Sequence, residues 1–258
     1  MSDDFDEKDL EDVLPEAKDA DGLWDTIKTV LIAVVIAVGV RTFAYEPFSI
    51  PSGSMIPTLL VGDYLFVSKA SYGYSQHSLP FSLPLIPGRV MYTEVTRGDV
   101  VVFKLPTDGR TDYIKRIIGL PGDSIQVKGG VLHINGEAVV RKSLGEYTYQ
   151  DTHGIFHTTT QYEETLPNGK THLILEESDS DRADNTPVYH VPPDHYFAMG
   201  DNRDNSRDSR YLMDVGYIPK ENLVGQAKFL FFSNDGSFWT IWNWPWSLRL
   251  NRFFDGII

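Results

Sequence analysis

The feature that most restricts how this chain can fold is an uninterrupted apolar run over residues 29–40. The run is shorter than the roughly 20 residues that cross a bilayer as a helix. Its flanks carry side chains that suit the two membrane surfaces, namely Trp24, Lys28, Arg41 and Tyr45. These flanks bring the segment to a spanning length, so we expect a retained transmembrane anchor over residues 23–45.

Two other structures are compatible with an apolar run of this length. A cleaved signal peptide is disfavoured, because the preceding tail is acidic and a proline-rich segment, rather than a small-residue cleavage site, follows. The core helix of a soluble domain remains the alternative. The distribution of basic residues predicts a cytoplasmic N-terminus. Lys8, Lys18 and Lys28 precede the apolar run, whereas Arg41 follows it and the next basic residue is Lys69.

The negative charge of the chain is concentrated before the anchor. The formal net charge is −13, and residues 1–25 contain eleven acidic side chains against two lysines, so −4 remains for the rest. We expect residues 1–22 to form a disordered acidic cytoplasmic tail. Phosphate binding requires clustered cations, so we expect no nucleic-acid partner. The chain has no cysteine, which excludes disulfides and thiolate nucleophiles.

Short β-rich runs separated by turn residues dominate from residue 46 onward and predict an all-β domain over residues 46–258. The expected strands, of which the last three form a meander, are Tyr64–Val67, Val100–Phe103, Ile125–Val127, Val131–Ile134 and Ala138–Val140. Asn135-Gly136 and Asn168-Gly169 are typical of hairpin turns. The polar stretch Leu144–Pro187, with an acidic run over residues 176–184, is interpreted as a hairpin-bearing insertion.

Aromatic residues are concentrated at the C-terminal end, where residues 229–258 contain ten Phe or Trp side chains. The simpler interpretation is a closing strand with aromatic core packing. The alternative is an amphipathic surface at the lipid headgroups, where indole rings are favoured and Arg249 and Arg252 face phosphate. The tryptophans concerned are Trp239, Trp242, Trp244 and Trp246.

Several common catalytic motifs are missing from the sequence. His153 and His157 lie in a turn-like segment, and the patterns HExxH, GxSxG and SxxK do not occur. We therefore expect neither a metal nor another cofactor.

Three segments differ from ordinary structural sequence. In PFSIPSGSMIPTL, residues 47–59, three prolines disfavour a helix and Gly53 allows close approach of another group beside Ser54. In DYIKRIIGLPGD, residues 112–123, Lys115 sits in an apolar strand-like run. GDNRDNSRDSRY, residues 200–211, balances three aspartates with three arginines and indicates a turn cross-linked by ion pairs.

Together these segments resemble bacterial type I signal peptidases, the membrane-bound serine proteases that remove signal peptides from exported proteins. Four boxes carry the resemblance, in order after the anchor: PSGSMIPTLLVGDYLFVSK, RGDVVVFKLP, YIKRIIGLPGD and MGDNRDNSRDSR. They cover roughly residues 23–128 and 190–235. The resemblance implies an antiparallel-sheet catalytic domain of signal-peptidase type with a β-hairpin insertion, preceded by one N-terminal transmembrane helix. About residues 128–190 then form a variable inserted subdomain.

The resemblance also implies the catalytic roles. Ser54 matches the nucleophile and Lys115 the general base, while the Ser52 hydroxyl joins the Ser54 backbone N–H in the oxyanion hole. Ser206 matches the residue that hydrogen-bonds the lysine. A lysine accepts the serine proton only when it is neutral, so its pKa has to fall from about 10.4 toward the working pH. Burial among apolar neighbours lowers it.

Supporting residues follow from the same boxes. Asp208 and Arg210 match a supporting ion pair, and Arg116 lies beside the base. The residues implied to line shallow pockets for small P1 and P3 side chains are Phe48, Ile50, Val102, Tyr113 and Ile114.

The implied partners are preproteins with A-x-A cleavage sites, together with membrane lipid. The implied location is the bacterial inner membrane, with the catalytic domain on the periplasmic side. A self-cleaving Ser/Lys protease of the repressor-like class is the first alternative, but its DNA-binding half and internal cleavage site are not found. A non-catalytic membrane-tethered β-domain is the second, and it does not account for Ser52, Ser54, Lys115 and Ser206 together.

Overall fold

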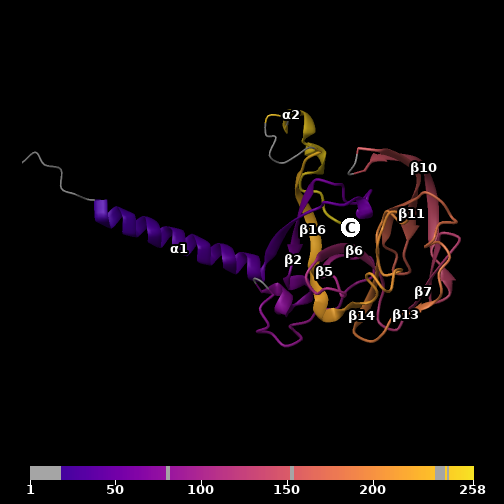
Figure 1. The fold of residues 1–258 in the computed structure, drawn as a ribbon, viewed down its shortest axis with the longest axis horizontal. Helices are drawn as coiled ribbons and strands as arrows, with labels where there is room; N and C mark the ends of the chain where they lie inside the picture. Colours follow the sequence, from indigo (N-terminus) through magenta and orange to yellow (C-terminus); the bar gives the residue numbers. More distant parts are fainter. Residues whose placement is uncertain (1–18, 80–81, 152–153, 236–241, 243) are drawn as a thin grey trace, which may run out of the picture. The chain divides into compact units, whose positions relative to one another are not determined.

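The computed structural model describes residues 19–79, 82–151, 154–235, 242 and 244–258 (Figure 1). The chain divides into two compact units, one that ends at Val40 and one over Arg41–Ile258. The expectation of a disordered tail falls mostly on residues 1–18, outside the described part, as does the expectation for Trp239.

The first unit contains most of the single long helix α1, Asp19–Phe43. Its 25 residues extend about 37 Å at 1.5 Å per residue. The window Gly22–Gly39 is long and apolar enough to cross a membrane. Its large apolar side chains are exposed, for example Val35 at 70% and Ile36 at 60%, whereas the core helix of a soluble domain would bury them.

The second unit is built from antiparallel sheets, which confirms the predicted all-β class. Its largest sheet has seven strands in the order β1-β2-β16-β5-β6-β14-β15. In that order the strands are Tyr45–Ser49, Asp63–Ser68, Leu223–Ser233, Val100–Lys104, Asp112–Gly119, His195–Met199 and Ile218–Pro219.

Three smaller sheets complete the unit. A four-stranded sheet has the order β13-β7-β8-β9, a three-stranded sheet has the order β10-β11-β12, and β3 pairs with β4. In the four-stranded sheet the strands, in that order, are Tyr189–His190, Ser124–Lys128, Val131–Ile134 and Glu137–Ala138. In the three-stranded sheet they are Val140–Gln150, Phe156–Thr165 and Thr171–Glu176. Strands β3 and β4 are Tyr74–Ser75 and Arg89–Val90.

Most of the predicted strands and both hairpin turns are confirmed. Asn135 and Gly136 have φ values of 55° and 85°, the left-handed conformation that a tight hairpin turn requires. The prediction of one strand over Ala138–Val140 is wrong. Strand β9 ends at Ala138, and Val140 begins β10 in a different sheet, because the buried Val139 turns the chain from one sheet to the next.

The predicted hairpin is present, and the expected inserted sheet is larger than one hairpin. Strands β10 and β11 form a long ladder from Val140↔Thr165 to Gln150↔Phe156, and β12 adds a third strand along β11. Figure 1 shows these strands at the side of the unit away from β1 and β2. Their inner face brings Tyr149 and Leu175 into a small core with Ile56.

The C-terminal segment combines aromatic packing with exposed indole rings. After β16 the chain forms a short helix α2, Trp244–Ser247, and a 3₁₀ turn, Leu250–Arg252. Trp244 and Phe253 pack against Phe232, with ring centroids 5.3 and 5.7 Å away. Trp242 and Trp246 are 69% and 85% exposed, so this segment presents apolar surface as well as packing on β16.

Candidate active site

Ser54 lies in a 3₁₀ turn, Gly53–Met55, beyond the end of β1. Asn202 holds this turn in two places. Its backbone N–H donates to the Ser54 carbonyl oxygen at 3.1 Å, and its Nδ2 donates to the Gly53 carbonyl oxygen at 3.1 Å. Ser54 is 8% exposed, so its hydroxyl occupies a fixed and nearly dry position.

Lys115 projects from β6 onto this serine. Its Nζ lies 2.5 Å from Ser54 Oγ and 3.0 Å from the carbonyl oxygen of Ile114. Among the described residues, no carboxylate forms an ion pair with Lys115. In contrast, Lys69 and Lys104 pair with Glu46 and Asp112, each at 2.9 Å. Lys115 is therefore the lysine that can act as a neutral base.

Burial lowers the pKa of Lys115 to about 8, because the ammonium form loses its hydration when the side chain is only 4% exposed. Asp208 and Asp201 raise the pKa by through-space attraction, but this effect is smaller than that of burial. A substantial fraction of the amine is then neutral near pH 8, as a general base requires.

Two buried ion pairs surround the lysine. Arg210 binds Asp208 in a bidentate manner, with Nε–Oδ1 at 2.9 Å and Nη2–Oδ2 at 3.0 Å. Arg116 binds Asp201 through Nε–Oδ1 at 2.8 Å and Nη2–Oδ2 at 2.7 Å. Burial alone would raise the pKa of both aspartates, but the guanidinium groups outweigh it and lower their pKa values. Both carboxylates therefore stay ionised and paired, so neither holds a proton that it could transfer to Lys115.

Gly200 allows the fourth box, MGDNRDNSRDSR, to pack directly on the nucleophile turn. A Cβ atom at this position would collide with the Ser54 carbonyl oxygen and with Ser206 Oγ. Ser206 is buried beside it, yet within the described part of the chain its hydroxyl has no hydrogen-bond partner. The bond to Lys115 implied by the resemblance is not formed in this conformation, because Nζ contacts Ser54 and Ile114 instead.

The sequence of this chain matches the family described as signal peptidase, peptidase S26, over residues 23–232. The chain belongs to the signal peptidase family. The signal peptidase I of Rickettsia akari is 43% identical over 243 residues, which is 87% of this chain and 89% of the relative. The Rickettsia typhi signal peptidase I is 42% identical over 243 residues, covering 87% of this chain and 90% of the relative.

A crystal structure of a signal peptidase I from Enterococcus faecalis is also similar. It is 23% identical, and the match covers 52% of this chain and 97% of that chain with a TM-score of 0.30. Membership of the signal peptidase family rests on the sequence matches.

In this member of the signal peptidase family, a cleft of about 1130 Å³ opens beside Ser54 and Lys115. Ser52 and Ser206 line it, and Ser52 is exposed. All five residues implied for small substrate side chains line it as well: Phe48, Ile50, Val102, Tyr113 and Ile114. Phe48 and Ile114 pack against the core cluster that contains Ile50 and Val102. The apolar wall is therefore part of the packed core and has a fixed shape.

The sequence analysis missed one wall of this signal peptidase cleft. Tyr149 from β10 and His157 from β11 line it, and their rings stack with centroids 5.3 Å apart. The Tyr149 hydroxyl accepts a hydrogen bond from Asn202 Nδ2 at 3.1 Å, which links the inserted sheet to the nucleophile turn. The alternation of Tyr147 and Tyr149 was the available signal, but local sequence does not reveal which surface such residues face.

Asn202 and Asp201 were also missed as individual residues, although they lie in the fourth box, MGDNRDNSRDSR. Both are fully buried. Their partners, Gly53 and Arg116, are 149 and 85 positions away in the sequence, so spacing alone gives no indication of these contacts. The interpretation of residues 200–211 as a turn cross-linked by ion pairs needs one correction. Asp208–Arg210 lies inside the turn, while the other described ion pairs of the turn reach outward to Arg116, Glu164 and Asp214.

Proposed function

We propose that this chain is a membrane-anchored serine endopeptidase that removes N-terminal signal peptides from exported preproteins, with Ser54 as nucleophile and Lys115 as general base. The observation that carries the proposal is the 2.5 Å approach of Lys115 Nζ to Ser54 Oγ in a buried site. A buried lysine without a carboxylate partner is costly for stability, so its place beside a serine in a cleft supports a catalytic role.

In the acylation step, neutral Lys115 takes the proton of Ser54 as Oγ attacks the scissile carbonyl carbon. The C–O bond forms while the carbonyl π electrons move to the oxygen, which gives a tetrahedral oxyanion. Collapse of this intermediate breaks the C–N bond. The protonated Lys115 then returns its proton to the leaving amine, and the signal peptide stays bound to Ser54 as an ester.

In the deacylation step, water replaces the serine as the attacking group. Lys115 takes a proton from this water as its oxygen bonds to the ester carbonyl carbon, and collapse of the tetrahedral intermediate breaks the ester C–O bond. Lys115 passes that proton to Ser54 Oγ, which regenerates the enzyme, and the signal peptide leaves as a carboxylic acid that releases its remaining proton to solvent.

The developing oxyanion requires donors that are already in position. We assign this role to the Ser54 backbone N–H and the Ser52 hydroxyl. One such donor contributes about 2.7–4 kcal/mol to transition-state stabilisation. We assign Ser206 to orient the Lys115 amine after rotation of its hydroxyl, which is not engaged by a partner in the described structure. The Asp208–Arg210 and Asp201–Arg116 pairs hold the segments on either side of the base.

The substrate preference follows from the cleft. Phe48, Ile50, Val102, Tyr113 and Ile114 line an apolar wall of the cleft beside the nucleophile. The resemblance implies that this wall receives small side chains at P1 and P3. We therefore propose cleavage at A-x-A sites.

We propose that residues 1–22 are a cytoplasmic tail, residues 23–45 the anchor and residues 46–258 the peptidase domain, with about residues 128–190 as its inserted subdomain. The enzyme then crosses the inner membrane once, with its catalytic domain on the periplasmic side. Membrane lipid is the second proposed partner, and we propose no nucleic-acid partner. The nine positions from Tyr45 to Ser54 keep the nucleophile near the bilayer surface, where signal-peptide cleavage sites emerge.

The decisive experiment is cleavage of a purified preprotein that carries an A-x-A site. The wild-type chain is expected to release the mature protein, whereas Ser54→Ala and Lys115→Met do not. Ser143→Ala and Lys104→Met are the matched controls, because Ser143 is exposed and Lys104 pairs with Asp112. Cleavage that survives either Ser54→Ala or Lys115→Met would exclude the Ser/Lys mechanism.

The orientation is tested separately. Because the chain has no cysteine, Ser2→Cys and Ser143→Cys each introduce a single thiol. In intact spheroplasts, a membrane-impermeant maleimide is expected to label Ser143→Cys and to spare Ser2→Cys. The reverse pattern would overturn the proposed orientation without bearing on the catalytic pair.

A further inference from the structure

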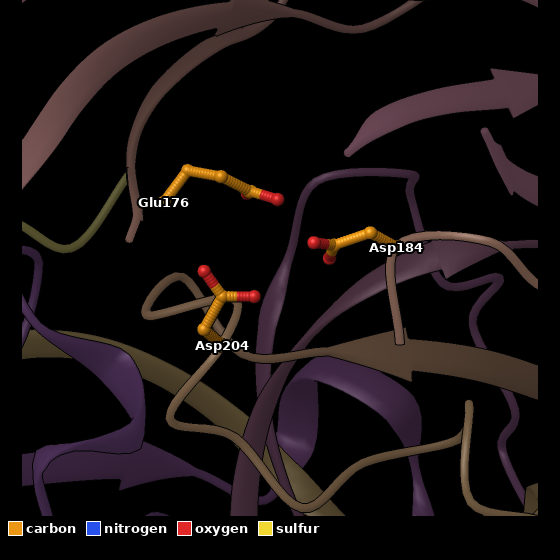
Figure 2. A group of neighbouring side chains, drawn as sticks. All are labelled: Glu176, Asp184 and Asp204. Carbon is orange, nitrogen blue, oxygen red and sulfur yellow. The ribbon is translucent and has the colours of Figure 1, made fainter. Parts of the chain in front are cut away.

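Three carboxylates from separate segments converge beside the cleft. Glu176 ends strand β12, Asp184 lies in the loop that follows, and Asp204 lies in the turn that carries Ser206. One oxygen of each carboxylate lies within 4.8 Å of the other two. Figure 2 shows the three side chains directed toward a common centre.

The carboxylate oxygens at this centre have no partner. Within the described residues, Glu176 Oε2, Asp184 Oδ1 and Asp204 Oδ1 accept no hydrogen bond. Glu176 is 3% exposed and Asp184 is 0% exposed, so water does not reach them freely. A buried carboxylate oxygen without a partner is strongly destabilising, and three together call for a positive charge between them.

The backbone fixes two of these carboxylates in place. Asp204 Oδ2 accepts the backbone N–H groups of Glu177 and Ser178 at 2.7 and 3.1 Å. Asp184 Oδ2 accepts the backbone N–H of Asp181 at 2.5 Å. In each aspartate one oxygen is used to hold the side chain, and the other is left for a ligand.

Within the described residues, neither of the nearby arginines forms an ion pair with these three carboxylates. Arg203 forms its ion pair with Glu164 at 2.5 Å, and Arg210 forms its pair with Asp208.

We infer that Glu176, Asp184 and Asp204 form a calcium site that fastens the inserted sheet to the catalytic turn. Ca²⁺ prefers oxygen ligands at about 2.3–2.6 Å and tolerates irregular geometry, so ligand oxygens up to about 5 Å apart can share one ion. Water completes its coordination. The site departs from the sequence-based expectation that the chain holds no metal, and it does not depend on the proposed peptidase function.

The position of the site gives the ion a structural task. Asp204 lies two residues before Ser206 and four before Asp208, whereas Glu176 and Asp184 belong to the insertion and the loop after it. Bound Ca²⁺ would add a further link between these segments, beside the Arg203–Glu164 ion pair and the hydrogen bonds from Glu177 and Ser178 to Asp204.

The test uses the full chain in detergent micelles, freed of metal with a chelator and then titrated with CaCl₂. Calorimetry and thermal unfolding are followed for the wild type and for Asp184→Asn, Asp204→Asn and Asp179→Asn. Asp179→Asn is the matched control, because it removes one charge from the same acidic run but its carboxylate is 57% exposed and pairs with Arg141.

We expect the wild type and Asp179→Asn to bind Ca²⁺. Their unfolding midpoint should rise by roughly 5–10 °C when Ca²⁺ exceeds its Kd by about 100-fold. Asp184→Asn and Asp204→Asn should each weaken binding by at least about tenfold, and agreement between two separate segments guards against misfolding of one variant. No binding by the wild type at 10 mM CaCl₂, or equal binding by both variants, would overturn the inference.

Discussion

Lys115 Nζ meets Ser54 Oγ at 2.5 Å although three strands, β2, β16 and β5, separate β1 from β6 in the sheet. Four strand spacings would place the two strands about 19 Å apart in a flat sheet. The segment after β1 therefore returns over the sheet to bring the serine to the lysine. Asn202 and Gly200 secure this return, one by hydrogen bonds and the other by leaving room for the turn.

The first prediction concerns the pH dependence of cleavage. Because the base has to be neutral and the pKa of Lys115 is about 8, kcat/KM should rise about tenfold per pH unit below pH 8 and level off above it. At pH 6 only about 1% of the amine is neutral. Rates between pH 6 and 10 on a substrate without groups titrating in that range check this. A profile that is flat, or that falls through pH 8, would contradict the assignment.

The second prediction concerns the stability cost of the base. The pKa of Lys115 is lower in the folded state than in the unfolded state. The resulting loss of stability is complete below pH 8 and fades as the pH rises from 8 to 10.5. Lys115→Met should therefore be more stable at pH 7 by on the order of 3 kcal/mol, with the gain fading by pH 10.5. Denaturant unfolding at both pH values measures it. Lys104→Met should differ little from wild type, and equal stability of Lys115→Met and wild type at pH 7 would be inconsistent with a lowered pKa of Lys115.

The third prediction concerns Asn202 as a positioning residue. Asn202→Ala removes the Nδ2 bonds to Gly53 and Tyr149 and lets the nucleophile turn move, so kcat should fall about 10- to 100-fold with KM little changed. The pKa seen in the pH profile should stay near 8, because Lys115 remains buried. Asn222→Ala is the control, since Asn222 Nδ2 donates to the Lys104 carbonyl oxygen and Asn222 does not line the cleft. A KM effect alone would assign Asn202 to substrate binding instead.

The fourth prediction concerns lipid. Trp242 and Trp246 are exposed, while Trp244 packs on Phe232. In a form restricted to Arg41–Ile258, the double variant Trp242→Ala/Trp246→Ala should bind anionic vesicles at least about tenfold more weakly. Met213→Ala is the control, because Met213 is 90% exposed and lies in another segment. Unchanged sedimentation of the double variant with vesicles would refute a lipid-facing surface.

Local sequence was sufficient to predict the elements whose conformation depends on neighbouring residues in the chain. The turn at Asn135-Gly136 follows from the backbone freedom of two residues, and β2 and β5 follow from short β-branched or aromatic runs. The position of Lys115 on a strand followed from its apolar neighbours. The roles of Ser54 and Lys115 came from the resemblance of ordered motifs, because spacing alone cannot bring residues 61 positions apart into contact.

The parts that sequence did not reveal depend on distant partners. Val140 has the β-branched side chain of a strand, but which sheet it joins is decided by its pairing with Thr165. The sequence does not distinguish Asn202 from the other polar residues of its box, because its partners Gly53 and Tyr149 are distant in the chain. Ser206 shows the opposite case: the resemblance implied a bond to Lys115, and the rotamer in the structure does not make it.

Tyr149 has a consequence for how such enzymes can diversify. Its hydroxyl accepts hydrogen bonds from Asn202 and Asn205, so one side chain of the inserted sheet touches the segment that supports the nucleophile. The inserted sheet therefore cannot be exchanged independently of the turn that supports the nucleophile. A graft from a relative that lacks a hydroxyl at this point would leave Asn202 Nδ2 with one acceptor fewer, and such a chimera would lose turnover even with every residue of the catalytic sheet unchanged.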